Sequence, residues 1–225
     1  FSHMSYIADI GVEYGAVAAN FEGFGTIALS IKALSIGDIA VTTTSNPDGT
    51  GETFSPTMVT AGVSYSRMLT DAISVGLTAN LVSERMANVS ATGVAFDFGV
   101  IYQNLADING LHIGVVLKNL GTEMQFDGSG LYNEGQLTEG NRPPTLYKVD
   151  SAPFEMPFNF QLAAGYRPVI DEMNSLLFTG IYQNNNFSGD EYKLGGEYGY
   201  NNMFFVRAGY LLSPDVGESF GESNY

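Results

Sequence analysis

The chain has 225 residues, a formal net charge of −15, 44% hydrophobic residues and only 15% charged residues, against roughly 25% charged in an average soluble domain. The acidity excludes nucleic-acid binding, which needs clustered Lys and Arg. The absence of cysteine excludes disulfides and thiolate metal sites. No apolar run approaches the roughly 18 residues that a membrane-spanning helix needs.

Hydrophobic residues recur at every second position along almost the whole chain, which predicts strands and not helices. In chain order, about ten strands are predicted, at 5–19, 26–43, 58–68, 73–81, 94–103, 111–126, 158–167, 175–186, 191–200 and 203–212. Many have about ten residues, whereas soluble strands average about five or six. Strands tilted across a bilayer need about nine to eleven residues, so the lengths favour a transmembrane β-barrel.

The face opposite the apolar one carries Gly, Ser, Thr, Asn and scattered charges. Six of these charges are predicted to face the lumen of a barrel, namely Asp97, Lys118, Arg167, Lys193, Glu197 and Arg207. Because Lys193, Glu197 and Arg207 lie on adjacent predicted strands, we expect ion pairs that rigidify the interior. A constriction that selects solutes is the alternative.

The predicted connections alternate between short and long. The short ones lie near Glu22-Gly23, Thr70-Asp71, 106–110, 170–173 and Asn201-Asn202, and the longer ones at 45–56, 86–92, 127–157, 187–190 and the tail from Ser213. Short periplasmic turns opposite longer extracellular loops are typical of outer-membrane barrels. The acidic residues concentrate in the longer connections, which would form an acidic outer rim.

Five tyrosines precede short turns and are predicted to lie on the apolar face, namely Tyr14, Tyr65, Tyr102, Tyr166 and Tyr198. A tyrosine ring favours a position with one apolar and one wet end, so we expect an aromatic girdle at the periplasmic boundary. Ordinary strand preference for Tyr is the competing explanation.

The segment 127–157 holds four glycines and four prolines and is too long for an idle connection. We expect it to fold over the outer mouth of the barrel or to contact a partner.

Catalytic constellations are missing, so the chain is not expected to be an enzyme. His3 and His112 are far apart in sequence, and His112 is expected to point into the lumen. The loop 46–52 places oxygen-bearing residues at alternate positions, as calcium loops do, but turn chemistry explains Pro47-Asp48-Gly49 equally. No metal or other cofactor is predicted.

Four stretches resemble sequences of the PorV/PorQ family of outer-membrane proteins in order and spacing, at 47–54, 88–97, 194–198 and 204–210. The resemblance covers nearly the whole chain, and its motifs are structural. It implies a FadL-like barrel of about fourteen strands, within the range known for such barrels. The chain, 1–225, would then be one partial barrel domain whose first and last strands lie outside this sequence.

The resemblance also implies a role and a location. PorV proteins of the type IX secretion system hold the signal domain of secreted cargo at the surface of the bacterial outer membrane. We therefore expect contacts with lipid and with protein partners bound through extracellular loops. The alternatives are a FadL-like channel for hydrophobic solutes, a structural barrel that anchors a surface assembly, and a soluble β-sandwich.

Overall fold

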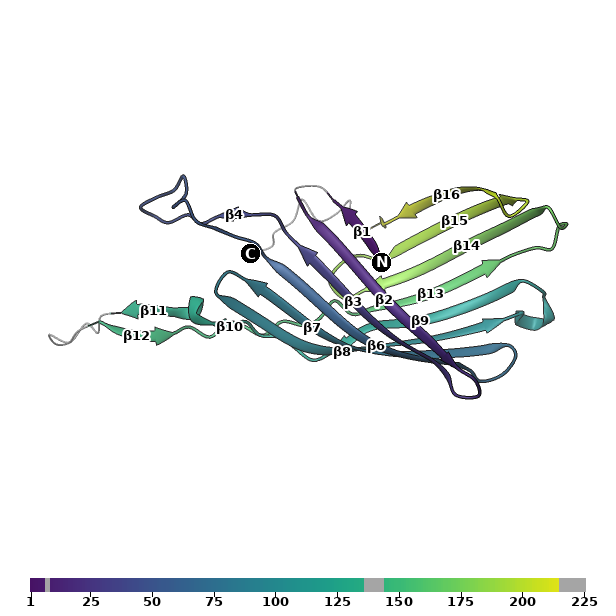
Figure 1. Ribbon diagram of the computed structural model, residues 1–225, viewed down its shortest axis with the longest axis horizontal. Helices are drawn as coiled ribbons and strands as arrows, with labels where there is room; N and C mark the ends of the chain where they lie inside the picture. The colour runs from purple at the N-terminus through teal and green to yellow at the C-terminus, as the bar shows by residue number, and fades with distance from the viewer. Residues whose placement is uncertain (7–8, 136–143, 215–225) are drawn as a thin grey trace.

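The structure is a computed structural model that describes residues 1–6, 9–135 and 144–214 (Figure 1). It is all-β, and almost all of its strands belong to one antiparallel sheet. In spatial order, the strands of this sheet are β1 (Ser2–Ser5), β2 (Gly11–Phe21), β3 (Gly25–Ser35), β6 (Thr57–Met68), β7 (Ile73–Met86), β8 (Val89–Gln103), β9 (Leu111–Gly121), β13 (Asn159–Tyr166), β14 (Asn174–Asn185), β15 (Glu191–Tyr200) and β16 (Phe204–Leu212).

The remaining elements lie in the connections between these strands. They are β4 (Ile39–Ala40), which pairs with β5 (Thr53–Phe54); β10 (Asp127–Gly128), which pairs with β8; β11 (Tyr132–Gly135), which pairs with β12 (Thr145–Lys148); and the 3₁₀ helices η1 (Leu105–Asp107) and η2 (Ser129–Leu131).

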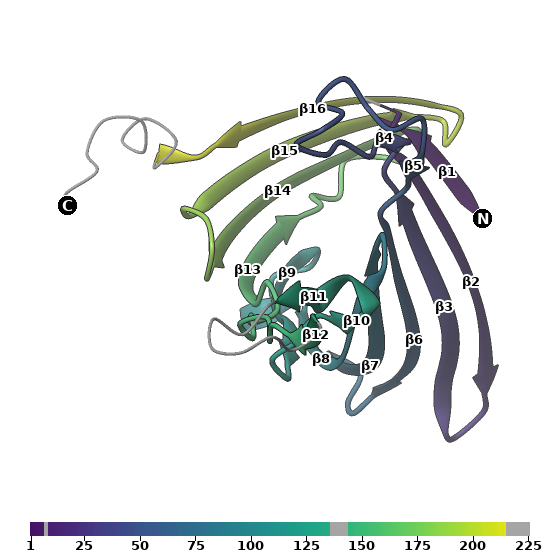
Figure 2. The same cartoon turned by 90° about the vertical axis from the view of Figure 1, so that its left-hand side faces the viewer.

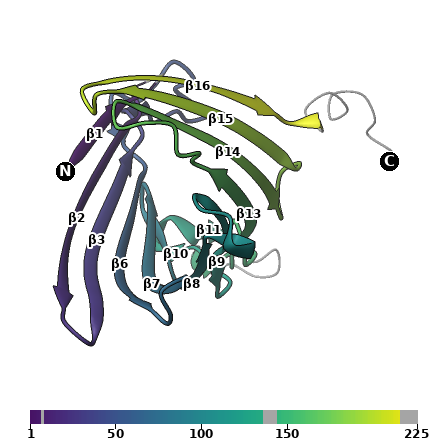
Figure 3. The ribbon, with the colours of Figure 1, turned by 90° about the vertical axis from the view of Figure 1, so that its right-hand side faces the viewer.

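The main sheet is strongly curved, as the two end views show (Figures 2 and 3). Its edges are β1 and β16, which do not pair with each other, so the sheet forms an open trough with a convex and a concave face. The described chain therefore confirms a large antiparallel sheet and leaves it unclosed.

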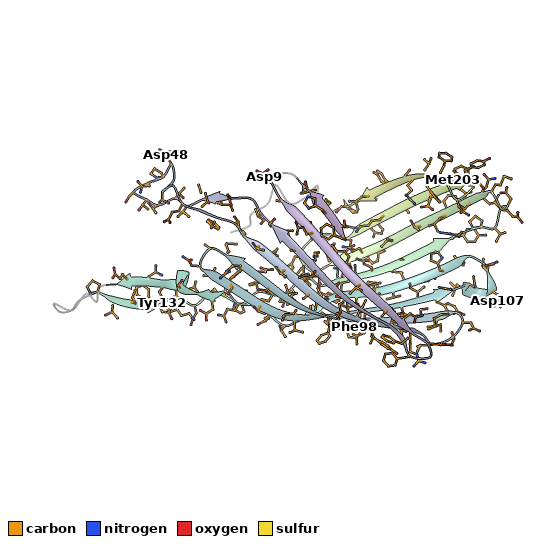
Figure 4. The ribbon with its side chains drawn as sticks, in the orientation of Figure 1. Asp9, Asp48, Phe98, Asp107, Tyr132 and Met203 are labelled. Atoms are coloured by element: carbon orange, nitrogen blue, oxygen red, sulfur yellow. The ribbon has the colours of Figure 1, made fainter. Side chains whose placement is uncertain are left out.

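The connections gather at two ends of the trough (Figure 1). The turn end carries the short turns 22–24, 69–72, 104–110, 167–173 and 201–203, all of which agree with the prediction. The loop end carries the long connections 36–56 and 122–158. Figure 4 labels Asp48 and Tyr132 at the loop end and Asp107 and Met203 at the turn end.

One connection predicted as long is in fact tight. β7 and β8 are joined only by Ala87 and Asn88, since Met86 already pairs with Val89. The predicted loop 86–92 is therefore wrong, because its small residues, such as Ala91, continue the strand beneath a covering segment. The connection between β14 and β15 is 186–190, which agrees with the predicted 187–190 to within one residue.

Two predicted strands are interrupted. The segment 5–19 divides into β1 and β2, because the Tyr6 N–H donates to the Ile10 carbonyl at 2.7 Å and Asp9 adopts a φ of 57°. Within the segment 26–43, only the residues up to Ser35 belong to the main sheet. Beyond it, the Ser55 hydroxyl donates to the carboxylate of Asp38 and holds the start of the β4–β5 excursion.

The convex face is apolar and exposed. Its central row runs through register partners on consecutive strands, from Val17 to Leu29 to Val63. Leu29 is 53% exposed, and comparable side chains follow across the face, among them Leu81, Phe98, Phe178 and Leu194. The chain exposes 16341 Å² in all, whereas a compact globule of this mass exposes about 10,000 Å². The apolar face of the sheet is therefore not buried against other parts of the described chain.

The only fully buried apolar cluster among the described residues is small and lies on the concave face. It consists of Ala91, Ala95, Met124 and Met156. Ala91 and Ala95 belong to β8, and the two methionines belong to a segment that crosses over β8. Elsewhere the concave face carries mostly small and polar side chains.

Candidate functional site

A polar cluster on the concave face is centred on Asp97 of β8. One carboxylate oxygen accepts the Asn80 side-chain amide at 2.8 Å, and the other accepts the backbone N–H of Asn119, also at 2.8 Å. The β8–β9 register shifts at this position, and Asn119 adopts a φ of 58°. Asp97 therefore holds a β-bulge in β9, which is a common way to bend a strand and redirect a side chain.

The bulge borders a cavity of about 560 Å³ on the concave face. Its polar lining includes Tyr14, Lys32 and Lys118 and the carboxylates of Glu84 and Asp97. Its apolar lining is formed by Met58, Met124, Phe154 and Met156 together with Leu34 and Val82. Such a mixture suits an amphipathic ligand, with an apolar body against the methionines and an anionic group near the lysines.

Three of the apolar lining residues, Met124, Phe154 and Met156, belong to a segment that we call the strap, residues 122–126 and 149–158. Its two halves meet where Met124 and Phe154 exchange backbone hydrogen bonds of 2.8 Å. The Phe126 and Phe154 rings stack at 5.3 Å. The strap can lie close to β8 because Gly93 has no side chain. A Cβ atom at this position would collide with Met124 and Met156.

The strap is also tied to the sheet by hydrogen bonds. The Asn119 amide donates to the Pro157 carbonyl at 2.9 Å, and the Asn186 amide donates to the Met156 carbonyl at 3.2 Å. Part of the predicted loop 127–157 thus folds over the concave face. The expectation that this loop folds over the outer mouth of a barrel stays a prediction.

A second polar network spans β13, β14 and β15 on the same face. The Gln161 amide donates to Gln183 at 3.2 Å, and the Lys193 ammonium donates to the same Gln183 oxygen at 2.7 Å. Lys193 also pairs with Glu191 at 2.9 Å. Periodicity identified Lys193, but nothing in the sequence pattern identified its partners.

The predicted inward charges take different positions. Asp97, Lys118 and Lys193 lie on the concave face as described above. Glu197 and Arg207 face each other in the register, and the Arg207 Nε lies 2.5 Å from the Glu197 carboxylate. Of the ion pairs expected among Lys193, Glu197 and Arg207, the one that forms joins Glu197 and Arg207. Lys193 pairs with Glu191 instead.

Arg167 departs from the prediction. β13 ends at Tyr166, and Arg167 lies in the following turn, where its backbone N–H donates to the Gly110 carbonyl at 2.9 Å. The cause is Pro168, because a proline cannot continue the ladder and restricts the residue before it.

Four of the five predicted tyrosines lie on the convex face towards the turn end. They are Tyr65, Tyr102, Tyr166 and Tyr198, whose register partners belong to the convex apolar rows. The Tyr65 hydroxyl donates to the Phe24 carbonyl at 2.7 Å, and the Tyr198 hydroxyl donates to Asn174 at 2.5 Å. Whether they form a girdle at a membrane boundary stays a prediction.

The prediction that Tyr14 lies on the apolar, convex face is wrong. It pairs with Lys32 in the register and lines the concave cavity. Residues 15–19 read Gly-Ala-Val-Ala-Ala, so both faces of β2 carry small apolar side chains and the period of two does not fix the facing. Because successive side chains of a strand point to opposite faces, Glu13 lies on the convex side, where its carboxylate is 3.8 Å from the His3 ring.

The β11–β12 hairpin projects from the loop end (Figure 1). At its base, the Lys148 ammonium lies 2.9 Å from Asp127 and 3.7 Å from Asp150. The hydrogen bond from Lys148 holds the pKa of the Asp127 carboxyl below its usual value. The same bond raises the pKa of Lys148, so the pair stays charged near neutral pH.

Over the described ranges, no three His, Asp or Glu side chains are placed so that they could hold a metal ion. In the same ranges, no helix is long and apolar enough to cross a membrane. No protein-family model matches the chain, and no curated protein is significantly similar to it.

Proposed function

We propose that the chain is part of the wall of a PorV-type β-barrel in a bacterial outer membrane, and that its loop end binds secreted or surface-attached proteins. The observation that carries this proposal is the distribution of polarity in the curved sheet, which is apolar on the convex side and polar on the concave side. Lipid outside and water inside favour that arrangement.

Strand length supports the same proposal. β7 has 14 residues and β8 has 15, which at about 3.3 Å per residue extends each beyond 40 Å. A tilted strand of about nine to eleven residues already crosses the hydrocarbon layer. A soluble protein with this sheet would expose an apolar patch far above the few hundred Å² that monomers usually tolerate.

The asymmetry of the two ends supports the proposed partner binding. Both long excursions, 36–56 and 122–158, leave the sheet at the loop end, and the described parts of the other connections are short turns. Loops positioned by a rigid scaffold are where binding function usually lies.

The first test is the orientation and location of the full-length protein. Epitope tags inserted at Asp48 and at Asp107 label opposite ends of the sheet. We expect an antibody to reach the Asp48 tag on intact cells and the Asp107 tag only after the outer membrane is permeabilised. Equal accessibility of both tags, or recovery of the protein in a soluble fraction, would contradict a barrel in the outer membrane.

The second test concerns partners. Affinity purification of the full-length protein from native membranes should recover secreted cargo or secretion subunits. A deletion of residues 132–148 should lose them, whereas a tag at Asp107 should not. Purification that recovers neither cargo nor subunits would contradict the secretion role and leave the membrane location standing.

The cavity favours a second candidate function, uptake of hydrophobic solutes. Its methionine and phenylalanine side chains provide apolar lining, and Lys32 and Lys118 also line it. Native mass spectrometry of the full-length protein should then detect a bound fatty acid that Phe154→Asp removes. A matched Phe126→Asp variant, on the strap but outside the cavity lining, should retain it.

A further inference from the structure

The β11–β12 hairpin is a two-stranded sheet on its own. Along the described chain, neither outer edge of the hairpin pairs with another strand. Its side chains are exposed on both faces, including Tyr132, Leu146 and Tyr147, and Leu146 is 65% exposed. An isolated hairpin is marginally stable in water, so apolar side chains presented in this way favour completion by a further strand.

The base of the hairpin is held firmly. β10 pairs with Ser90 and Val89 at the β7–β8 turn, and the Gly130 N–H donates to the Asn88 carbonyl at 3.3 Å. A side chain at Gly128 would collide with the Asn88 backbone, so this close approach requires glycine. The hairpin is therefore anchored to the sheet while its strands extend beyond it.

The register fixes which backbone groups face outward. The Val149 N–H donates to the Leu131 carbonyl at 2.9 Å, so alternate pairs such as Tyr147 with Asn133 bond to each other. The intervening residues direct their N–H and C=O groups away from the hairpin. Those residues are Leu146 and Lys148 on the β12 edge and Tyr132 and Glu134 on the β11 edge.

The loop end that carries the hairpin is acidic. In the described parts of the two long excursions, the acidic residues are Asp38, Asp48, Glu52, Glu123, Asp127, Glu134, Asp150 and Glu155. The only basic residue there is Lys148, which already pairs with Asp127 and Asp150. A strand that docks on this hairpin would meet a negative field, which attracts a cationic segment and repels an acidic one.

From these observations we infer that the β11–β12 hairpin is a strand-addition site that captures an extended, basic segment of a partner protein. Main-chain hydrogen bonds to one outer edge supply affinity, and the acidic surroundings select the sign of charge. This inference rests on the proposed binding of proteins at the loop end and names the surface and the chemistry of the partner.

The test uses the full-length protein in nanodiscs of neutral phosphatidylcholine, because a cationic peptide would bind anionic lipid by itself. The probe is a fluorescent octapeptide of alternating Lys and Val, and its counterpart replaces each Lys by Glu. In fluorescence anisotropy, we expect the Lys peptide to bind at least tenfold more tightly than the Glu peptide.

Proline variants locate the docking edge. Leu146→Pro removes an outward N–H of β12, and Glu134→Pro removes one of β11, while the inward pairs of the hairpin stay intact. One of the two should weaken binding of the Lys peptide tenfold or more. The matched controls Leu146→Ala and Glu134→Gln keep both N–H groups and should bind within threefold of the wild type.

Hydrogen exchange at the Tyr147 and Asn133 amides checks that each variant keeps its hairpin. If the Lys peptide does not bind, binds no better than the Glu peptide, or binds equally to both proline variants, strand addition is overturned. Recovery of cargo from native membranes by those same variants would then leave the proposed function standing. Loss of cargo by one proline variant alone would support both.

Discussion

The two faces of the same strands differ more than any two segments of the chain. On β2, Val17 points to the convex side and is 66% exposed, whereas its neighbour Ala18 points to the concave side opposite Ala28. On β8, Phe98 is convex and Asp97 is held on the concave side by two hydrogen bonds. Two residues that are consecutive in sequence thus face different surroundings, which is what a wall between two solvents requires.

The largest effect is expected when a positive charge is placed on the apolar convex face. In a bilayer, Val17→Arg should destabilise the full-length protein by about 2–4 kcal/mol, the cost of a cation on the lipid face at mid-depth. The matched Ala18→Arg, one residue away on the concave face, should cost less than about 1 kcal/mol. Urea unfolding in lipid vesicles measures both, and equal losses would mean that the convex face does not contact lipid.

The next effect tests the buried apolar cluster on the concave face. Met124 is almost fully buried between the strap and β8, so Met124→Ala should cost about 2–3 kcal/mol through the cavity it leaves. Met58→Ala is the control, since Met58 is 39% exposed and should lose under about 1 kcal/mol. Hydrogen exchange should show faster opening of 122–126 only in Met124→Ala. Equal losses in the two variants would show that the strap does not stabilise the sheet.

A smaller loss is expected from the polar side of the contrast. Asp97→Ala leaves the Asn80 amide and the Asn119 N–H without their acceptor, which should cost about 1–3 kcal/mol, reduced where water enters. Asp97→Asn keeps an acceptor oxygen and should recover part of the loss. Denaturant midpoints measure this order. A fully stable Asp97→Ala variant would show that the bulge does not depend on the carboxylate.

The smallest effect concerns pH at the turn end. Hydrogen bonds from the Asn174 side chain, and from the backbone N–H groups of Asn174 and Met173, lower the pKa of Asp171. A depressed folded-state pKa means that this stabilisation is present above the ordinary carboxyl value of about 3.9 and is lost as pH falls through the folded value. We expect the protection of the Met173 amide, measured as its exchange rate relative to the intrinsic rate at each pH, to fall in acid. In Asp171→Asn this protection should not depend on pH over that range.

Much of the sheet was predictable because alternation is strong where one face is bulky. Residues 94–103 alternate Val, Phe and Tyr against small or polar residues, and β8 covers them in the predicted facing. The short turns were predictable because residues such as Asn201 and Asn202 tolerate the positive φ of 51° that they adopt. The prediction failed at Tyr14, where small side chains on both faces left the facing undetermined.

The candidate site was only partly predictable. Asp97 and Lys193 could be placed on the correct face by counting along a strand. Their partners could not, because Asn119 reaches Asp97 only through a bulge and Gln183 reaches Lys193 from a neighbouring strand. The loop 127–157 was predicted to be more than an idle connection, but the contact of the strap with Gly93 depends on long-range packing that no local pattern encodes.

The strap has a consequence for assembly. Along the path of eleven strands from β1 to β16, each neighbour is also the next of these strands in sequence; only β10, which pairs with β8, lies off this path. β1 to β9 and β13 to β16 are therefore two meanders that can each form by pairing successive strands. They join only along β9 and β13, across the whole excursion 122–158. We expect closure of that long loop to be slower than pairing within either meander, because its contacts are less local. The strap that covers β8 also links the two meanders, since Asn119 of β9 and Asn186 after β14 both donate to it.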